Sequence, residues 1–185
     1  GGHGGLAISG NYMYVSSGVN GIDVLDISDP FNPFIDSTKN HNHWIGSLLI
    51  SNDGQYLYAA DNHLTTYDIS SSGSLVKTSE IWIPKNAGGP NVRNLTLSSD
   101  GTILIAAASK NGIVVYDLSS PAQPQLISSL ELSGRLWDVA ISADDSHLFC
   151  AAGSSFFQAV DISTVETPTV ISSVAGASDF SPLKL

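Results

Sequence analysis

The sequence has little charge, a single cysteine and no long apolar run. Charged residues make up 13% of its 185 residues, about half the usual share of roughly 25%. Lys and Arg total 7 against 17 Asp and Glu, so the formal net charge is -10. Because an acidic surface repels phosphate groups, we expect no nucleic-acid partner and no binding to an anionic membrane. No apolar run has the length of a membrane span.

The other scarcities also limit the chemistry. Cys150 cannot form an internal disulfide and has no second cysteine for a zinc site, so we expect an inert thiol in the core. The sequence contains no Gly-x-Ser-x-Gly, His-Glu-x-x-His or phosphate-loop motif. No segment has sustained helical periodicity, which excludes a helical solenoid. Hydrophobic residues nevertheless reach 42%, enough to build a core.

What the chain does contain is one unit repeated four times. Each unit has an Asp followed by Ile or Leu and then Ser, at Asp26, Asp68, Asp117 and Asp161. About 20 residues earlier each unit has a short apolar block that ends in Ser, at 6–9, 48–51, 95–98 and 139–142. A polar turn and a run of β-forming residues follow each block. The units therefore recur every ~45 residues, the length of a propeller blade.

Each unit predicts four short antiparallel strands. The first two form a hairpin, the third ends at the repeated Asp, and a weaker fourth strand follows prolines such as Pro33 and Pro124. Proline suits an edge strand because it donates no ladder hydrogen bond. We therefore predict an all-β fold, a β-propeller with four blades in this chain. The expected blades are about 1–45, 46–91, 92–136 and 137–175, and 176–185 begins a fifth unit or supplies a closing strand.

The repeated Asp residues could be mistaken for catalytic groups. Four equivalent copies at strand ends are instead typical of turn residues whose carboxylates accept backbone N–H groups. The Asp-Gly pairs of the hairpins have the same explanation, since none fits a twelve-residue calcium loop.

Residues 10–15 and 20–33 resemble the LVIVD repeat, and the second unit is also similar to blades of lactonase-type and YVTN-type propellers. The third unit has the turn Ser119-Ser120-Pro121-Ala122-Gln123-Pro124, and the fourth departs from it at 163–168. The resemblance implies a propeller, and for many family members an exported or cell-surface location. It says little about activity, because propellers carry many unrelated sites.

Four blades are few for this family, whose members are expected to have six to eight. We expect either a part of a longer propeller or a half-propeller completed by a second chain. The alternative is a closed four-bladed ring. An open array would expose an apolar end face that invites pairing.

The segments that precede the first strand of each unit are expected to line the mouth of the central channel. They contain both arginines, two of the three tryptophans and two histidines. Such residues suit a pocket for a small ligand, a glycan or a peptide. The candidate residues are His43, Trp44, Arg93, Asn94, Arg135, Trp137 and Asp138, with His3, Gly4, Gly5, Ser47 and Asn91 in the same segments. Alternatively, the tryptophans plug the channel and the arginines pair with carboxylates.

Two weaker candidates concern metal and glycan attachment. His41 and His43 lie two residues apart, on one side of a strand. Two histidines are too few for zinc without ligands from elsewhere, such as His3 or His63, so we expect no metal and no cofactor. Asn94-Leu95-Thr96 is an N-glycosylation sequon, but chance explains it as well.

Three functions remain. The first is a non-catalytic propeller module that binds a protein, a glycan or a peptide, or that helps to build an assembly outside the cell or at its surface. The second is a metal-dependent enzyme of lactonase-like type, with its site at the channel mouth around His43 and Asp138. The third is a structural half-propeller whose exposed sheet end drives polymerisation.

Overall fold

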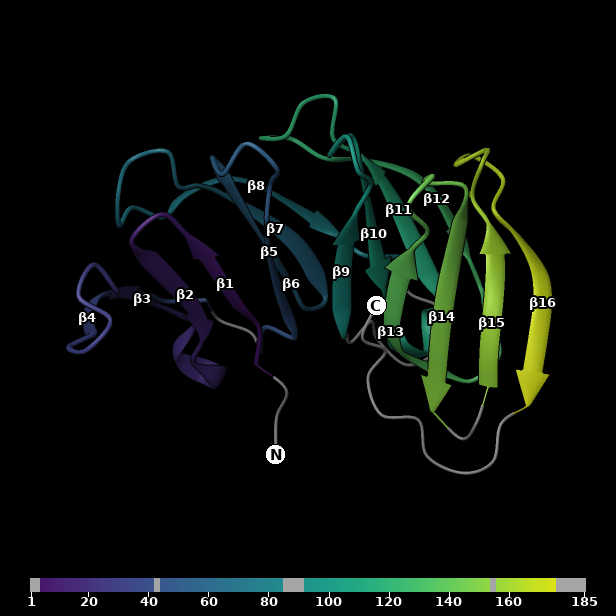
Figure 1. The fold of residues 1–185 in the computed structure, drawn as a ribbon, viewed down its shortest axis with the longest axis horizontal. Helices are drawn as coiled ribbons and strands as arrows, with labels where there is room; N and C mark the ends of the chain where they lie inside the picture. Colours follow the sequence, from purple (N-terminus) through teal and green to yellow (C-terminus); the bar gives the residue numbers. More distant parts are fainter. Residues whose placement is uncertain (1–3, 42–43, 85–91, 154–155, 176–185) are drawn as a thin grey trace. The chain divides into compact units, whose positions relative to one another are not determined.

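The computed structural model describes residues 4–41, 44–84, 92–153 and 156–175. Within these ranges the chain forms four sheets of four strands each, and two three-residue 3-10 turns. In every sheet the strands are antiparallel and neighbours in space are neighbours in sequence, as Figure 1 shows. The predicted all-β fold of four-stranded antiparallel blades is confirmed.

The strands fall in the order in which the repeat predicts them. Sheet 1 holds β1 (Leu6–Ser9), β2 (Tyr12–Ser16), β3 (Ile22–Asp26) and β4 (Phe34–Lys39). Sheet 2 holds β5 (Ser47–Ile50), β6 (Tyr56–Ala60), β7 (His63–Asp68) and β8 (Val76–Trp82). Sheet 3 holds β9 (Asn94–Leu97), β10 (Ile103–Ala107), β11 (Ile113–Asp117) and β12 (Gln125–Leu130). Sheet 4 holds β13 (Arg135–Ile141), β14 (His147–Gly153), β15 (Phe156–Asp161) and β16 (Thr169–Ala175).

The sheets group into two compact units. Unit 1 comprises 1–82 and 121–123, and unit 2 comprises 83–120 and 124–185. Sheets 1 and 2 thus belong to unit 1, and sheets 3 and 4 to unit 2. Each sheet has two ends. We call the end where the first strand begins the lead-in end, and the end where the third strand finishes the Asp-turn end.

The repeated aspartates end the third strand of every sheet. One carboxylate oxygen of each accepts the backbone N–H of the Ser two residues later, at 2.7–2.9 Å. This is the Asx turn that the repeat predicts. Hydrogen bonds with the side chain and with the backbone N–H of Ser28 lower the pKa of Asp26, and those with Ser70 lower the pKa of Asp68. The interpretation of these residues as turn formers is confirmed.

The hairpins between first and second strands use a second Asp in sheets 2 to 4. The Asp53 carboxylate accepts the Ser51 hydroxyl and the Gln55 backbone N–H. Asp100 and Asp144 make the equivalent bonds. Sheet 1 has only Gly10 and Asn11 between its strands. Gly10 has φ +55°, which suits this two-residue turn.

The fourth strand of each sheet contains no fully buried residue. β4 and β16 are exposed along their whole length, and a proline directly precedes β4, β12 and β16. Each fourth strand pairs with the third through a register shift at the same place. This repeated β-bulge leaves one residue of the fourth strand out of the ladder and bends the sheet edge.

The core of unit 1 lies between one face of sheet 1 and one face of sheet 2. Sheet 1 contributes Tyr14, Ile22 and Val24, which lie on one side of its strands by the pairing register. Sheet 2 contributes Leu48, Leu57, Ala59 and Tyr67.

The core of unit 2 is built in the same way from sheets 3 and 4. Cys150 lies in it with 1% of its surface exposed, and burial raises the pKa of its thiol to about 12. The structure thus confirms that Cys150 is buried. Among the described residues no helix is long and apolar enough to cross a bilayer.

Candidate functional site

The expected channel-mouth residues lie at the lead-in ends of the sheets. Trp44 belongs to unit 1, whereas Arg93, Asn94, Arg135, Trp137 and Asp138 belong to unit 2. His3, His43 and Asn91 fall outside the described residues, as does 176–185. The described candidates therefore fall into two separate groups, one in each unit.

In unit 2 the structure brings Arg93 and Trp137 together. The guanidinium carbon of Arg93 lies 4.9 Å from the centroid of the Trp137 ring, a cation–π contact. Arg93 continues the β9–β10 pairing, since its N–H donates to the Ala107 carbonyl. Trp137 comes from β13, which lies beside β9.

Trp137 lies at a point where sheet 4 departs from the repeat. β1, β5 and β9 pair with their second strands in unbroken register. The register of β13 with β14 shifts between Leu136 and Asp138, which makes Trp137 the extra residue of a β-bulge. A bulge re-aims the side chain that it carries. β13 also starts earlier than expected, at Arg135, which lies before the predicted blade boundary at 137.

The surroundings of the indole are tight on one side. A Cβ added to Gly153 would lie 2.2 Å from the indole nitrogen of Trp137. Only glycine leaves room for the ring in this position. The other side stays accessible, since 40% of the Trp137 surface is exposed. Trp137 is therefore not a buried plug of the channel.

The arginines have no carboxylate partner among the described residues. The ion pairs found there join His41 and His63 to Asp61, and Lys77 to Glu80. The Nε of Arg93 and the Oδ1 of Asn94 are buried atoms without a hydrogen-bond partner in the described ranges. Asp138 is half-buried, and its Oδ1 accepts the Val139 N–H. Arg135 is exposed.

In unit 1 the tryptophan at the lead-in end is also accessible. Trp44 is 47% exposed, and its ring lies 3.8 Å from the position that a Cβ on Gly18 would take. It is not a core residue either.

The buried polar group of unit 1 is centred on Asp61. His41 lies next to it, with Nε2 3.8 Å from Oδ2, and its Nδ1 lies 2.9 Å from the Tyr67 hydroxyl. His63 lies on the other side, with Nδ1 3.4 Å from Oδ1. The His63 ring packs on Trp82 at 4.0 Å between centroids. Asp61, His41 and His63 are each less than 10% exposed.

The neighbours of Asp61 determine the direction in which its pKa shifts. Burial alone would raise the pKa, but hydrogen bonds with the His41 side chain and the His63 backbone N–H, and the electrostatic influence of the two rings, hold the pKa below its usual value. Within the described ranges, no three His, Cys, Asp or Glu side chains are placed to hold a metal ion. The weak metal candidate His41 instead contacts Tyr67 and Asp61.

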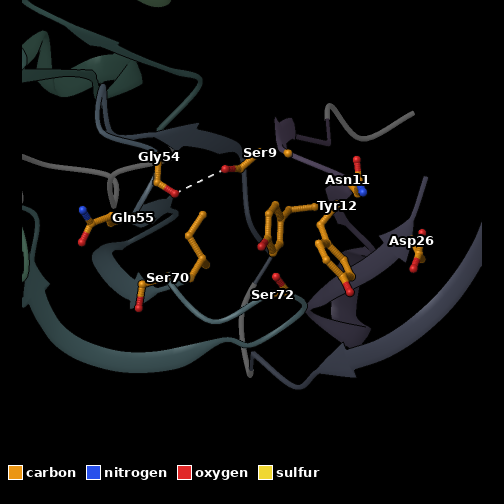
Figure 2. A pocket seen from close by; sticks show the side chains of 11 residues that line it. Ser9, Asn11, Tyr12, Asp26, Gly54, Gln55, Ser70 and Ser72 are labelled. Atoms are coloured by element: carbon orange, nitrogen blue, oxygen red, sulfur yellow. Dashed lines mark hydrogen bonds between the residues drawn. The ribbon is translucent and has the colours of Figure 1, made fainter. Parts of the chain in front are cut away.

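A pocket that the sequence does not predict lies at the Asp-turn end of unit 1. It has a volume of about 650 Å³, within the ~300–1,000 Å³ of many ligand pockets. Its lining is largely polar, and Figure 2 shows Tyr12, Asn11 and Gln55 around it, with the Ser9 hydroxyl bonded to the Gly54 carbonyl. Its residues come from hairpin turns and strand ends of both sheets, which a pattern search treats as turns alone.

Solved structures with a similar fold are larger propellers. A Bacteroides uniformis protein, provisionally described as a 6-phosphogluconolactonase, matches with a TM-score of 0.80 and 12% identity, over 94% of this chain and 57% of that one. The periplasmic gluconolactonase of Pseudomonas aeruginosa matches with a TM-score of 0.75 and 16% identity, over 94% of this chain and 56% of that one. A β-propeller domain from Myceliophteria thermophila matches with a TM-score of 0.68 and 17% identity, over 96% of this chain and 56% of that one. The chain spans just over half the length of these proteins, and identities this low show the fold alone.

At the level of sequence, no curated protein matches the chain. A family model does: the LVIVD repeat matches 1–38, 49–79 and 104–131, which together make up just over half of the chain. These segments include the turns on which the resemblance rests. The four sheets of four strands and the larger propellers that they match agree with it. The chain is a β-propeller protein and belongs to the LVIVD repeat family.

Proposed function

We propose that the chain is a non-catalytic propeller module that joins other propeller blades in a larger extracellular or cell-surface assembly. The observation that carries this proposal is the outward face of sheet 1. It carries a row of apolar residues, several of them exposed, and on the first three strands this row repeats the face by which sheet 2 packs on sheet 1.

The pairing register defines this face. Ile8 is opposite Met13, which is opposite Leu25, which is opposite Ile35, so one apolar row crosses all four strands. Leu6 lies on the same side, two residues from Ile8. Leu6 is 56% exposed, Ile8 55% and Ile35 59%. Single exposed apolar residues are ordinary, but a continuous row of them marks an interaction surface.

Sheet 2 shows what such a face does. Its equivalent row runs from Ile50 through Leu57 to Tyr67, and Leu48 takes the place of Leu6. Leu48, Leu57 and Tyr67 are each no more than 6% exposed, because they pack against sheet 1. On the first three strands, apolar or aromatic residues in the same register are therefore core in sheet 2 and half-buried or exposed in sheet 1, whereas on the fourth strand Lys77 takes the place of Ile35.

The side of sheet 4 that faces away from sheet 3 corresponds to the other of the two faces that meet within a unit. Ala140, Phe149 and Ala159 lie opposite one another, and Phe149 stacks on Phe157 at 6.0 Å. This side corresponds to the side of sheet 3 that holds Ile105 and Val115 against sheet 4. The faces that join blades within each unit thus recur on the outward sides of sheets 1 and 4. This supports a blade of the same repeat as the occupant of the sheet 1 face, supplied by a second copy when the chain is alone.

Light scattering on the purified chain tests this proposal. We expect a mass above the 19.4 kDa of one chain, and this mass should fall toward that of one chain in Ile8→Glu and Leu25→Glu. Val76→Glu is the matched control, because Val76 is 57% exposed but lies on the outermost strand β8. A wild-type chain of one-chain mass at every concentration would contradict the proposal, as would equal effects of the three substitutions.

We do not propose a metal-dependent lactonase-like reaction. Of the two residues on which that alternative depends, His43 lies outside the described residues, and Asp138 is described without any feature specific to that reaction. Location outside the cell is part of the proposal on the strength of the family resemblance.

A further inference from the structure

We infer that the lead-in end of unit 2 binds a small hydroxylated carboxylate, such as a sugar acid, between Arg93, Asn94 and Trp137. This goes beyond the proposed assembly and does not depend on it. The ligand class follows from three features of these residues.

The first feature is an arginine available for a negatively charged ligand. In a chain of net charge -10, Arg93 and Arg135 are the only arginines, and neither has an ion pair with a described residue. The Nε of Arg93 is buried without an acceptor in the described ranges. A buried donor left unsatisfied costs about 1–3 kcal/mol, and a ligand oxygen would supply the missing acceptor.

The second feature is the way in which the guanidinium is held. The guanidinium carbon of Arg93 lies over the Trp137 ring, 4.9 Å from its centroid, and such a contact uses no N–H group as a hydrogen-bond donor to an oxygen. The edge of N–H donors of a guanidinium matches the two oxygens of a carboxylate. The bulge at Trp137 occurs in none of the other three first strands, and Gly153 leaves room for the ring. Sheet 4 therefore departs from the repeat at the point where it meets Arg93.

The third feature is a neighbouring acceptor. The Oδ1 of Asn94 is buried without a partner among the described residues. Asn94 is opposite Ala107, which is opposite Ile113, and both of these residues pack against sheet 4. Asn94 thus lies on the face of sheet 3 that packs against sheet 4. A ligand hydroxyl would donate to this oxygen while the carboxylate binds Arg93.

The charge of the surroundings favours a carboxylate over a phosphate. Asp138 follows Trp137 directly and is half-buried. Its carboxylate would repel a doubly charged phosphate more than a singly charged carboxylate. A neutral sugar, in turn, would leave Arg93 without a counter-charge.

NMR of the indole N–H groups tests this assignment. The chain has three tryptophans, so Trp137→Phe identifies one signal, and Trp44 and Trp82 report on unit 1. We expect D-gluconate and D-glucuronate to shift the Trp137 signal with a dissociation constant in the range of about 0.1–10 mM, the weak end of the affinity scale. Glucose and inorganic phosphate should bind at least tenfold more weakly.

Variants of Arg93 distinguish the contribution of the planar guanidinium from that of its positive charge. Arg93→Lys keeps the charge but loses the planar fork, and it should weaken gluconate binding at least tenfold; Arg93→Gln should abolish binding. Lys39→Gln removes one charge in unit 1 and is the matched control, expected to leave the titration unchanged. Three dispersed indole signals show that each variant is folded. The assignment is overturned if gluconate leaves the Trp137 signal in place, if Arg93→Gln retains the shift, or if glucose or phosphate binds as tightly as gluconate. None of these outcomes depends on the mass measured for the assembly.

Discussion

The two ends of the sheets differ in how far their residues and contacts are repeated. At the Asp-turn end every sheet has the same arrangement, an Asp whose carboxylate accepts the backbone N–H of the Ser two residues later. At the lead-in end the sheets differ. Sheet 2 buries an Asp between two histidines, and sheets 3 and 4 place an arginine on a bulged tryptophan.

This contrast separates structure from specificity within one chain. The Asp that recurs in all four units has the same structural role in each blade, because its carboxylate accepts a backbone N–H after the third strand. A residue found in one unit alone cannot be explained by the repeat. The strongest candidates for function are therefore the residues that break it, and the following changes test that division.

The largest expected effect is at Asp61. Asp61→Ala leaves His41 and His63 buried without their carboxylate, and we expect a loss of about 3 kcal/mol in the free energy of unfolding. Asp68→Ala, in the same sheet, removes one exposed turn acceptor and should cost clearly less. Urea unfolding of both variants measures the difference. If Asp68→Ala were the more damaging change, the division between the two ends would be wrong for sheet 2.

Sheet 1 offers a second pair, which differs in steric surroundings. Gly21, in the connection at the lead-in end, has φ +104°, and a Cβ there would lie 2.1 Å from the Lys39 carbonyl oxygen. Gly10, in the hairpin at the Asp-turn end, has φ +55° and no described atom within 4 Å of such a Cβ. We expect Gly21→Ala to cost about 2–3 kcal/mol and Gly10→Ala about 1 kcal/mol. Thermal unfolding of the two variants checks the order, and equal shifts would mean that the close approach at Gly21 relaxes freely.

The fold was predictable because the sequence signals for strands and turns recur in each of the four units. The spacing of the aspartates, the Asn, Asp and Gly turns and the prolines before β4 and β12 each indicate the same four strands. Agreement among local signals is what makes a sequence specify one fold. The bulge in every fourth strand was not predicted, because it depends on pairing with the third strand and leaves no distinct residue pattern.

The candidate sites were predictable only in part. Arg93 and Trp137 were found as rare residue types in equivalent segments, but their contact depends on a bulge in β13 that nothing in the sequence marks. Asp61 and its contact with His41 were missed, although a signal existed. Residues 61–62 connect β6 to β7, whereas 17–21 connect β2 to β3, so the second unit departs from the first there. The pocket of unit 1 arises from turns of two sheets, and no single segment encodes it.

The contribution of ionised Asp61 to the free energy of unfolding should decrease in acid. Its pKa is below the usual value in the folded protein, so this group contributes stability that is present above its unfolded pKa, near 3.8. That contribution is lost as the pH falls through the lower, folded pKa. The stability gap between wild type and Asp61→Asn should therefore narrow as urea unfolding is repeated from pH 6 down to pH 3. A gap that widens in this range would mean that Asp61 is protonated in the fold.

The smallest expected effect is at Cys150, which occupies a repeated position. By the alignment of the second strands, Cys150 corresponds to Ala59 and Ala106, both fully buried. Cys150→Ala removes one buried heavy atom and should cost about 1 kcal/mol. The wild-type thiol, with a pKa of about 12 and 1% exposure, should not react with a disulfide reagent at pH 8 until urea unfolds the chain. Rapid labelling of the native protein would place Cys150 among the residues that depart from the repeat, and would extend the search for function into the core of unit 2.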